Sequence, residues 1–528
     1  VETEITITST DQGAIDVPLE RWIDPMAFGF YCGDHHIHGA GCSHYTTPTK
    51  GVLPEHLFQQ IKGEGLNVGC VLTWGPCYDY QRHFFSPRAN DLSDSMTLMK
   101  YDVEVSGFGS AALGHVCLLN LTDQTYPGSD GRSDQGWPTW TVPVMRWCRE
   151  QGGVTGYPHS ALGMNPRVAA DFLLKEGDRN EDGHLSPEEG DRVLLPTAFG
   201  SVDRDQNQLL SREEIRNATD EAADQLPNLA LPAMDGKGAM EIVVSVPEGV
   251  CDFVSAMDTE RLPEWNTWYH LLNCGFPLKL SGETDFPCMS SRRVGQGRVY
   301  VHLGRRERLQ FGEWIEGLAS GRSYVSDGFA HAVRFEVSSP NSPDEVRTPG
   351  PESLLLTRAG DLQIKARVAF APAIPKGVAY GTISPATGEG KRVIGDTVTL
   401  HGERQTGRVA GIPRLVELVV NGEVRGTKTL HADGTLHDLL FETTIEESSW
   451  VALRSFPQLH TNPVTVLVDG KPIRASRASA RWCETGVRML WQNRHRFISE
   501  AERPAARAAY DRAIATYRRI AEEAGERP

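Results

Sequence analysis

The sequence predicts an α/β protein with a barrel-like domain, a β-sandwich after it and a helix at the C-terminus. Between about residues 31 and 335, short apolar runs alternate with helical or loop stretches, and several of these runs end in polar residues. In α/β barrels the chemistry lies where the C-terminal ends of strands meet the loops, so polar strand ends favour a barrel. After about residue 336 the chain becomes β-rich, with hairpin signals at Asn421-Gly422 and Asp469-Gly470. The last stretch has helical periodicity and an S-x-x-E start at Ser499.

Changes in composition predict how these parts are divided along the chain. An alternating segment, "TEITITST", predicts a strand near the N-terminus, and an Asp-rich stretch interrupts the barrel. The expected parts are an N-terminal strand region at 1–30, an α/β barrel at 31–335 with an acidic insert at 170–225, a β-sandwich at 336–475 and a C-terminal helical tail at 476–528.

Length and charge exclude two classes of partner. A chain of 528 residues with 39% hydrophobic and 23% charged residues is typical of a globular protein with a large core. A formal net charge of -16 argues against a nucleic-acid partner, which needs a basic face. No apolar run approaches the roughly 18 residues of a membrane span. Because the chain starts at Val1 instead of methionine, we expect removal of a signal peptide and a secreted or periplasmic location.

Two acidic segments match the twelve-residue EF-hand loop position by position. "DRNEDGHLSPEE" has Gly183 for the sharp turn at position 6, whereas Gln208 takes that place in "DRDQNQLLSREE". A merely polar turn is the alternative, but two tandem loops with every oxygen position filled favour bound Ca²⁺. Whether calcium is sensed or only stabilises the insert stays open, with a structural role favoured. The expected calcium ligands are Asp178, Asn180, Asp182, His184 and Glu189 in the first loop and Asp203, Asp205, Asn207, Leu209 and Glu214 in the second.

A histidine-rich segment, "GDHHIHGAGCSHY", predicts a second kind of metal site. In a strand, residues two apart point to the same side, so His36 and His38 can share an ion while His35 faces away. Imidazole and carboxylate ligands suit zinc, manganese or iron. Further candidate ligands follow at predicted strand ends, although each alone is weak evidence: Glu104, His115, His159 and Asp285.

Several of these segments also resemble a known family. They are "FYCGDHHIH", "VEVSGFGSAALGHVCLL", "GYPHS", "NCGFPLKLSGETD", "GRSYVSDG", "SSWVALRSFPQLHTNPVTV" and "AERPAARAAYDRAIATYRR". Together they resemble the PHP-domain metallohydrolases, specifically the carbaryl-hydrolase-like CehA/McbA-type branch. The resemblance is diffuse but spans most of the chain, and the EF-hand pair is an addition to it. It implies a distorted (β/α)7 barrel with up to three metals in its mouth, followed by a β-rich domain.

The resemblance also implies a division of the ligands between metals. His36, His38 and Asp285 would hold the first metal, Glu104 would bridge the first and second metals, and His115 and His159 would complete the second. His44 matches a ligand of the third metal. The family's Thr-Asp-His is "TWGP" here, from Thr73, and its final Asp-x-His is "DFP", from Asp285. We therefore expect two divalent transition metals, with His44 left for another role.

With these ligands, the resemblance implies a metal-dependent hydrolase that uses a metal-bound hydroxide to cleave an ester, amide or carbamate bond. His44 is the expected general acid, and Arg292 is expected to hold an anionic substrate group unless it is simply a solvated basic turn. Cys42 and Cys77 are candidates for a disulfide across the mouth of the barrel, and either one is a candidate thiolate ligand. A phosphoesterase and a non-catalytic calcium-stabilised binding protein are the alternatives.

The substrate is expected to be a small molecule or saccharide-like. The loop at 122–145 carries two tryptophans and a tyrosine, which either stack on a sugar or aryl ring or pack the loop down.

Overall fold

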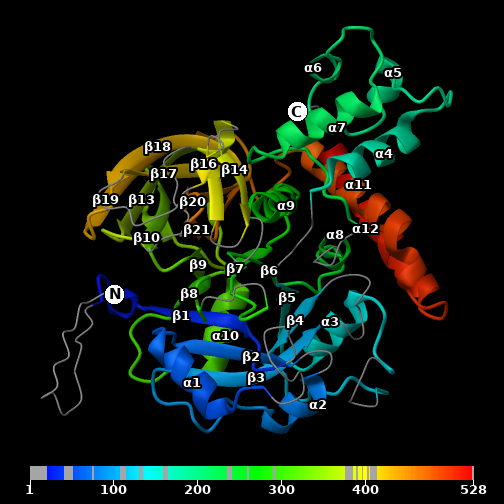
Figure 1. Cartoon of the computed structure of the whole chain (residues 1–528). Helices are drawn as coiled ribbons and strands as arrows, with labels where there is room; N and C mark the ends of the chain where they lie inside the picture. Colours follow the sequence, from blue (N-terminus) through cyan, green and yellow to red (C-terminus); the bar gives the residue numbers. More distant parts are fainter. Residues whose placement is uncertain are drawn as a thin grey trace, which may run out of the picture.

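The computed structural model describes most of the chain and places a large mixed sheet at its centre (Figure 1). The described residues are 21–40, 51–73, 77–106, 115–129, 135–158, 164–234, 241–257, 261–288, 293–374, 384–387, 390–394, 397–400, 403–404 and 413–525. The expected N-terminal strand in "TEITITST" lies outside them.

The first nine strands form one continuous part of this sheet, in the order β9-β8-β1-β2-β3-β4-β5-β6-β7. Strands β1 and β2 are almost entirely buried, as expected for strands covered on both faces. Their bounds are β1 (Phe30–Ile37), β2 (Val68–Thr73), β3 (Leu98–Val105), β4 (Val116–Leu119), β5 (Val154–Tyr157), β6 (Phe253–Ala256), β7 (Lys279–Gly282), β8 (Arg298–His302) and β9 (Ser323–Ser326).

Helices cover this part of the sheet. On α10 (Phe311–Ser320), Trp314 lies so close to β1 that a Cβ at Gly33 would be 2.3 Å from its ring. The Trp314 indole N–H donates to the Tyr31 carbonyl at 3.0 Å. A glycine in the middle of β1 is therefore required for this packing. The other helices of this part are α1 (Pro54–Gly63), α2 (Tyr78–Gln81), α3 (Thr141–Glu150), α8 (Ile242–Ser245) and α9 (Arg261–Asn273).

The expected (β/α)7 barrel is wrong, because the sheet contains antiparallel pairs. β4 is antiparallel to both β3 and β5, and β8 is antiparallel to both β1 and β9. Only residues 106–115 separate β3 from β4, which is too short for the crossover of a dozen or more residues that parallel neighbours need. The strands β1, β2, β3, β5, β6 and β7 nevertheless run in one direction, so their C-terminal ends meet at the same edge of the sheet.

A separate four-stranded antiparallel sheet lies in the C-terminal half of the chain, in the order β11-β10-β13-β19. Its inward residues, such as Phe335 and Ile364, share a hydrophobic core with Val416 and Leu453 of the large sheet. Its strands are β10 (Ala330–Ser339), β11 (Ser342–Arg347), β13 (Gly360–Phe370) and β19 (Leu436–Ile445). The large sheet continues into this half through β12 (Leu354–Leu356), β17 (Pro413–Val420), β18 (Glu423–His431), β20 (Ser449–Ser455), β21 (Leu459–Thr461) and β22 (Val464–Val468). A third, small sheet consists of β14 (Gly390–Ile394), β15 (Thr397–Leu400) and β16 (Glu403–Arg404).

The two hairpin signals have different outcomes. Asn421 and Gly422 both have positive φ and join β17 to β18, as predicted. Asp469 and Gly470 also have positive φ, but their turn leads toward a helix instead of a strand.

The acidic insert projects from the sheet between β5 and β6 (Figure 1). It consists of α4 (Pro166–Gly177), α5 (Pro187–Gly190), α6 (Phe199–Val202) and α7 (Arg212–Ala222).

The C-terminal part of the chain forms two helices, α11 (Arg477–Arg494) and α12 (Arg503–Glu523), instead of the single expected helix. Arg481 on α11 donates to the carbonyl of Val193 in the insert at 3.1 Å, and Tyr517 on α12 donates to the carbonyl of Val243 in α8 at 2.9 Å. The helix pair therefore joins the insert to the sheet domain. None of the helices in the described ranges is long and apolar enough to cross a membrane.

Candidate metal centre

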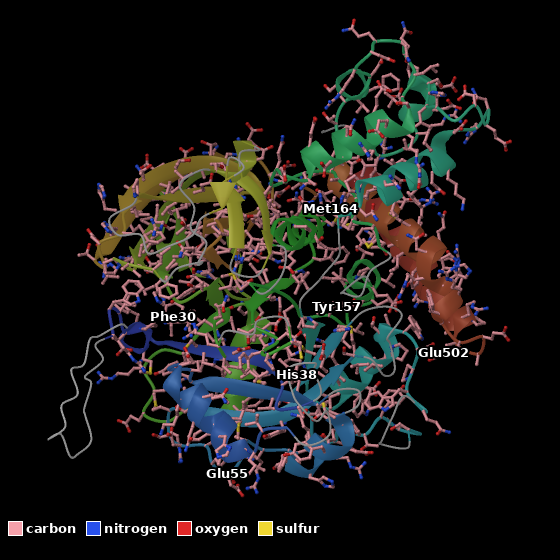
Figure 2. All side chains as sticks on the ribbon, in the orientation of Figure 1. Phe30, His38, Glu55, Tyr157, Met164 and Glu502 are labelled. Atoms are coloured by element: carbon pink, nitrogen blue, oxygen red, sulfur yellow. The ribbon has the colours of Figure 1, made fainter. Side chains whose placement is uncertain are left out.

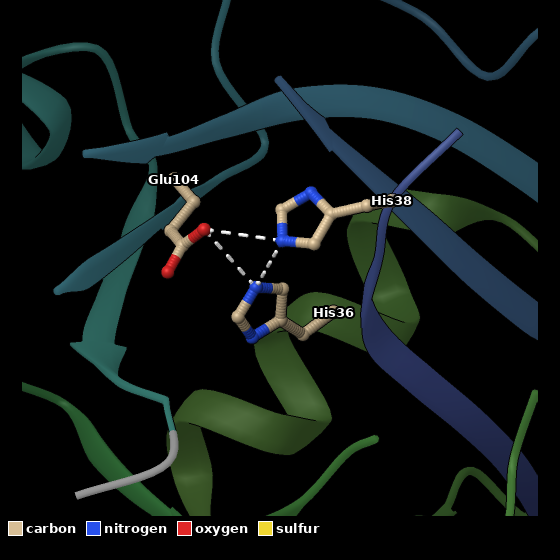
Figure 3. Close-up of side chains that lie close together, drawn as sticks. All are labelled: His36, His38 and Glu104. Atoms are coloured by element: carbon tan, nitrogen blue, oxygen red, sulfur yellow. Dashed lines mark hydrogen bonds and ion pairs between the residues drawn. The ribbon is translucent and has the colours of Figure 1, made fainter. Parts of the chain in front are cut away.

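The histidine pair predicted from the sequence lies at the C-terminal end of β1, inside the molecule (Figure 2). His36 and His38 are buried, and their Nε2 atoms are 3.0 Å apart. The Oε2 atom of Glu104, near the end of β3, lies 3.3 Å from Nε2 of His36 and 3.2 Å from Nε2 of His38 (Figure 3). Asp285, which follows β7, places Oδ1 at 3.4 and 2.9 Å from the same two nitrogens. The structure thus brings these four predicted ligands together.

Three of these atoms, from His36, His38 and Glu104, are separated from one another as the ligands of a tetrahedral metal site are. Ligand atoms about 2.0–2.1 Å from a tetrahedral ion lie about 3.3–3.4 Å from one another. The five separations given above range from 2.9 to 3.4 Å. Two imidazoles and two carboxylates also form a donor set that suits zinc, manganese or iron. The side chains present therefore fit the predicted first metal.

A second layer of contacts orients the two imidazoles. Nδ1 of His36 lies 2.9 Å from Oε2 of Glu283, and Nδ1 of His38 lies 2.9 Å from the carbonyl oxygen of Leu72. Metal-binding histidines usually direct their second nitrogen to a carboxylate or a backbone carbonyl in this way, which leaves Nε2 for the ion. Glu283 also accepts the backbone N–H of Asp285 at 2.8 Å, so it positions ligands from two different strands.

The loop after β7 is held against β1 by a buried carboxylate. Asp34 accepts the backbone N–H groups of Thr284, at 3.2 Å, and of Gly295, at 2.9 Å. Burial raises the pKa of Asp34 to about 7 in spite of its hydrogen bonds with Thr284. His38 donates its backbone N–H to the carbonyl of Phe286 at 2.7 Å, which ties the same two segments together. Asp34 is therefore a positioning residue for Asp285.

The predicted second metal site is only partly within the described residues. Oε1 of Glu104 lies 2.9 Å from Nδ1 of His115, so the carboxylate faces the His36–His38 pair with one oxygen and His115 with the other. This is the arrangement that a bridging carboxylate requires. The remaining predicted ligand, His159, lies outside the described residues, as do His44, Arg292 and Cys42.

The EF-hand loops have the predicted backbone conformation at their turn positions. Gly183 has a φ of +85°, and Gln208 has a φ of +65° at the equivalent position of the second loop. Their backbone N–H groups donate to the first aspartate of each loop, Asp178 at 2.8 Å and Asp203 at 3.0 Å. Four further loop side chains likewise accept backbone N–H groups of their own loops, namely those of Asn180, Asp182, Asp205 and Asn207.

The two loops also pair with each other. Leu185 and Leu210 exchange backbone hydrogen bonds of 3.0 and 2.8 Å, and both side chains are buried. The last ligands of the loops, Glu189 and Glu214, are the N3 residues of capping boxes with Ser186 and Ser211. Oxygen atoms of Asp203, Asp205 and Glu214 lie within 4.8 Å of one another. The local geometry is that of an EF-hand pair, whose position-7 carbonyls belong to His184 and Leu209.

Sequence reasoning missed three contributors to the centre. Glu283 lies two residues before Asp285 in "GETD", so an E-x-D pattern at a strand end was the available signal. Asp34 adjoins the histidines, but its role depends on partners 250 and more residues away. Leu72 contributes through its backbone, which no side-chain pattern reveals. His35 faces away as predicted and lies 2.8 Å from the Ser281 hydroxyl.

No protein-family model matches this chain, and no curated protein or solved structure is significantly similar to it.

Replacing Glu283 with glutamine is expected to weaken binding of transition metal by roughly 10–100-fold, the usual effect of losing an outer carboxylate partner. The amide retains an oxygen for the N–H of Asp285 but removes the charge beside His36. Competition with a chromophoric chelator measures the affinity. The matched control is Glu55→Gln on the exposed face of α1, which should bind like the wild type. Equal affinities for the Glu283 and Glu55 variants would refute the role assigned to Glu283.

The metal affinity of the apoprotein is expected to rise with pH up to about 9. Burial lowers the pKa of His38, but hydrogen bonds and charge from Asp285 and Glu104 outweigh this and raise it to about 9. Burial also lowers the pKa of His36, but the carboxylates around it raise that pKa well above its ordinary value. Because the ion must displace these protons, affinity should increase by about tenfold or more per pH unit below pH 9. Conversely, the protonated His38 stabilises the apoprotein fully below about pH 6.5, and this contribution is lost as the pH rises through 9. Calorimetric titration with zinc at pH 6, 7 and 8 checks the sign, and a flat profile would be inconsistent with it.

Proposed function

We propose that the protein is a metal-dependent hydrolase whose active site lies at the edge of the sheet where β1, β3 and β7 end. The observation that carries the proposal is the buried group of His36, His38 and Glu104, whose ligand atoms lie 3.0–3.3 Å apart, with a carboxylate oxygen of Asp285 against both histidines. Zinc, manganese and iron are the metals that this donor set suits. The proposal also includes calcium ions bound in the insert. It places the protein outside the cytoplasm, where calcium is plentiful.

Glu104 is the central residue of the proposed mechanism. Its two oxygens face opposite sides, toward the His36–His38 pair and toward His115, so it would hold one ion on each side. When bound, two such ions acidify a water molecule to supply hydroxide near neutral pH and polarise the substrate's carbonyl or phosphoryl oxygen. His115 retains 24% of its side-chain exposure while the other described ligands are buried. Substrate would therefore approach from the His115 side.

Three residues outside the described ranges complete the proposal. His44 would donate the proton that the leaving group takes, and Arg292 would hold an anionic group of the substrate. His159 would complete the set of ligands around the second ion, together with Glu104 and His115.

The proposed substrate is a small molecule with an ester, amide or carbamate bond, and a phosphoester is the alternative. The aromatic residues of the 122–145 loop give no support for a saccharide, because Trp137 and Trp140 are both only 5% exposed. Tyr126 also packs against Trp137, with the ring centroids 5.6 Å apart. These rings favour packing of the loop over stacking on a sugar.

A substrate panel tests this function. The panel consists of carboxyl esters, anilides, aryl carbamates and phosphoesters. Each substrate would be incubated with zinc- or manganese-loaded protein and with protein from which a chelator has removed the metal. We expect hydrolysis of at least one carbonyl substrate that disappears on stripping and returns on reloading. Turnover of phosphoesters alone would favour the phosphoesterase, and no turnover by fully loaded protein would favour a non-catalytic, calcium-stabilised binding protein.

A further inference from the structure

A cysteine lies beside the first metal site. A ring nitrogen of His38, a carboxylate oxygen of Asp285 and Sγ of Cys288 all lie within 4.8 Å of one another. Cys288 follows Asp285 by three residues and is half-buried, so its thiol lies on a more open side than the two other groups.

The backbone fixes this cysteine relative to the histidine. Residues Ile37 and Phe286 form a parallel β-bridge, and His38 donates its N–H to the carbonyl of Phe286 at 2.7 Å. Asp34 accepts hydrogen bonds from the backbone N–H and the hydroxyl of Thr284, the residue before Asp285. The segment that carries Cys288 is therefore attached to β1 on both sides of Asp285, independently of any ion.

We propose that Cys288 is a further ligand of the ion held by His38 and Asp285, and that its thiolate makes this site select zinc over manganese. The inference rests on the proposed metal-dependent function and adds a soft ligand to an otherwise imidazole and carboxylate donor set. On binding, the S–H bond breaks, its proton passes to solvent, and the sulfur electron pair forms the bond to the ion. Thiolates favour zinc, whereas carboxylate and water ligands suit manganese.

The geometry allows this bond with a small movement. A thiolate sulfur about 2.3 Å from zinc and an imidazole nitrogen about 2.1 Å from it lie roughly 3.6 Å apart in a tetrahedral arrangement.

A second thiol near the centre is a weaker candidate. Cys117 on β4 is fully buried, but among the described residues it does not belong to a group whose ligand atoms all lie within 4.8 Å of one another, as Cys288 does. It serves as the comparison for Cys288.

Cobalt substitution tests the proposal without relying on activity. Apoprotein of the full chain would be titrated with Co²⁺, and its absorption spectrum recorded for the wild type, Cys288→Ser and Cys117→Ser. We expect an intense near-ultraviolet sulfur-to-cobalt charge-transfer band in the wild type and in Cys117→Ser, but not in Cys288→Ser, which should retain the weaker visible bands of bound cobalt. Those retained bands show that the serine variant is folded and loaded.

The other outcomes each overturn a different claim. Bound cobalt without the charge-transfer band in the wild type, or a band that persists in Cys288→Ser, overturns the role of Cys288 and leaves the metal centre intact. No binding of cobalt to the wild type overturns the proposed function itself.

Competition between zinc and manganese tests the predicted selectivity. Zinc affinity in Cys288→Ser should fall by at least the roughly 10–100-fold that the loss of an outer partner costs, while manganese affinity stays unchanged. An equal fall for both metals overturns the selectivity.

Discussion

Replacing Glu104 with glutamine is expected to abolish binding of the second transition metal and to lower hydrolysis by on the order of 10³-fold or more. Glu104 is the residue whose two oxygens face both halves of the centre, at 3.3 Å from His36 and 2.9 Å from His115. An amide offers one oxygen and no charge, so it does not bridge two cations. Because metal ions contribute several kcal/mol of transition-state stabilisation, their loss has an effect of this size.

The measurement combines metal content with steady-state kinetics on the best substrate of the panel. Glu55→Gln is the control, since Glu55 lies on the exposed face of α1, far from His38 (Figure 2). Full metal content together with undiminished turnover in Glu104→Gln would contradict the bridging role.

Removing calcium is expected to unfold the insert while the sheet domain remains folded. The loop carboxylates accept backbone N–H groups, as Asp178 and Asp203 do, but without a cation their like charges would repel one another. A site filled at 100 times its dissociation constant contributes about 2.7 kcal/mol, so two sites account for most of the stability expected of a small unit. Thermal unfolding with and without a calcium chelator should show a separate transition at lower temperature only in the chelated sample.

Adjacent glutamates provide matched variants for this prediction. Glu189→Gln and Glu214→Gln remove the residue predicted to bind calcium with both carboxylate oxygens, and each should weaken one site. Glu188→Gln and Glu213→Gln change the neighbouring, exposed residue and should leave both sites unchanged. If all four variants bind calcium equally, the EF-hand interpretation of these loops is wrong.

Local features of the structure could be predicted from the sequence because their residues lie close together in the chain. The H-x-H spacing placed His36 and His38 on one side of a strand, and the structure confirms that their Nε2 atoms converge. The EF-hand loops were readable for the same reason, including the positive φ that Gln208 adopts without glycine's freedom. The convergence of Glu104 and Asp285 on the pair followed from the common direction of the strands that carry them.

Features that depend on contacts between distant parts of the chain could not be predicted from the sequence. Periodicity does not reveal whether neighbouring strands are parallel, so the antiparallel β4 and the loss of the (β/α)7 barrel were missed. Glu283 and Asp34 act on partners that only the folded sheet brings near. The helix predicted to start at Ser499 begins at Arg503 in the structure. The Glu502 side chain there accepts hydrogen bonds from Ser499 and from Thr139, a residue distant in the sequence.

The most direct test of the metal-dependent hydrolase is elemental analysis of the whole chain, purified without chelators and again after reconstitution with zinc or manganese. The account predicts about two transition-metal ions and two calcium ions per chain, with the second transition-metal ion lost in Glu104→Gln and the calcium content reduced in Glu189→Gln. Calcium alone, with no transition metal even after reconstitution, would contradict it and leave a calcium-stabilised binding protein.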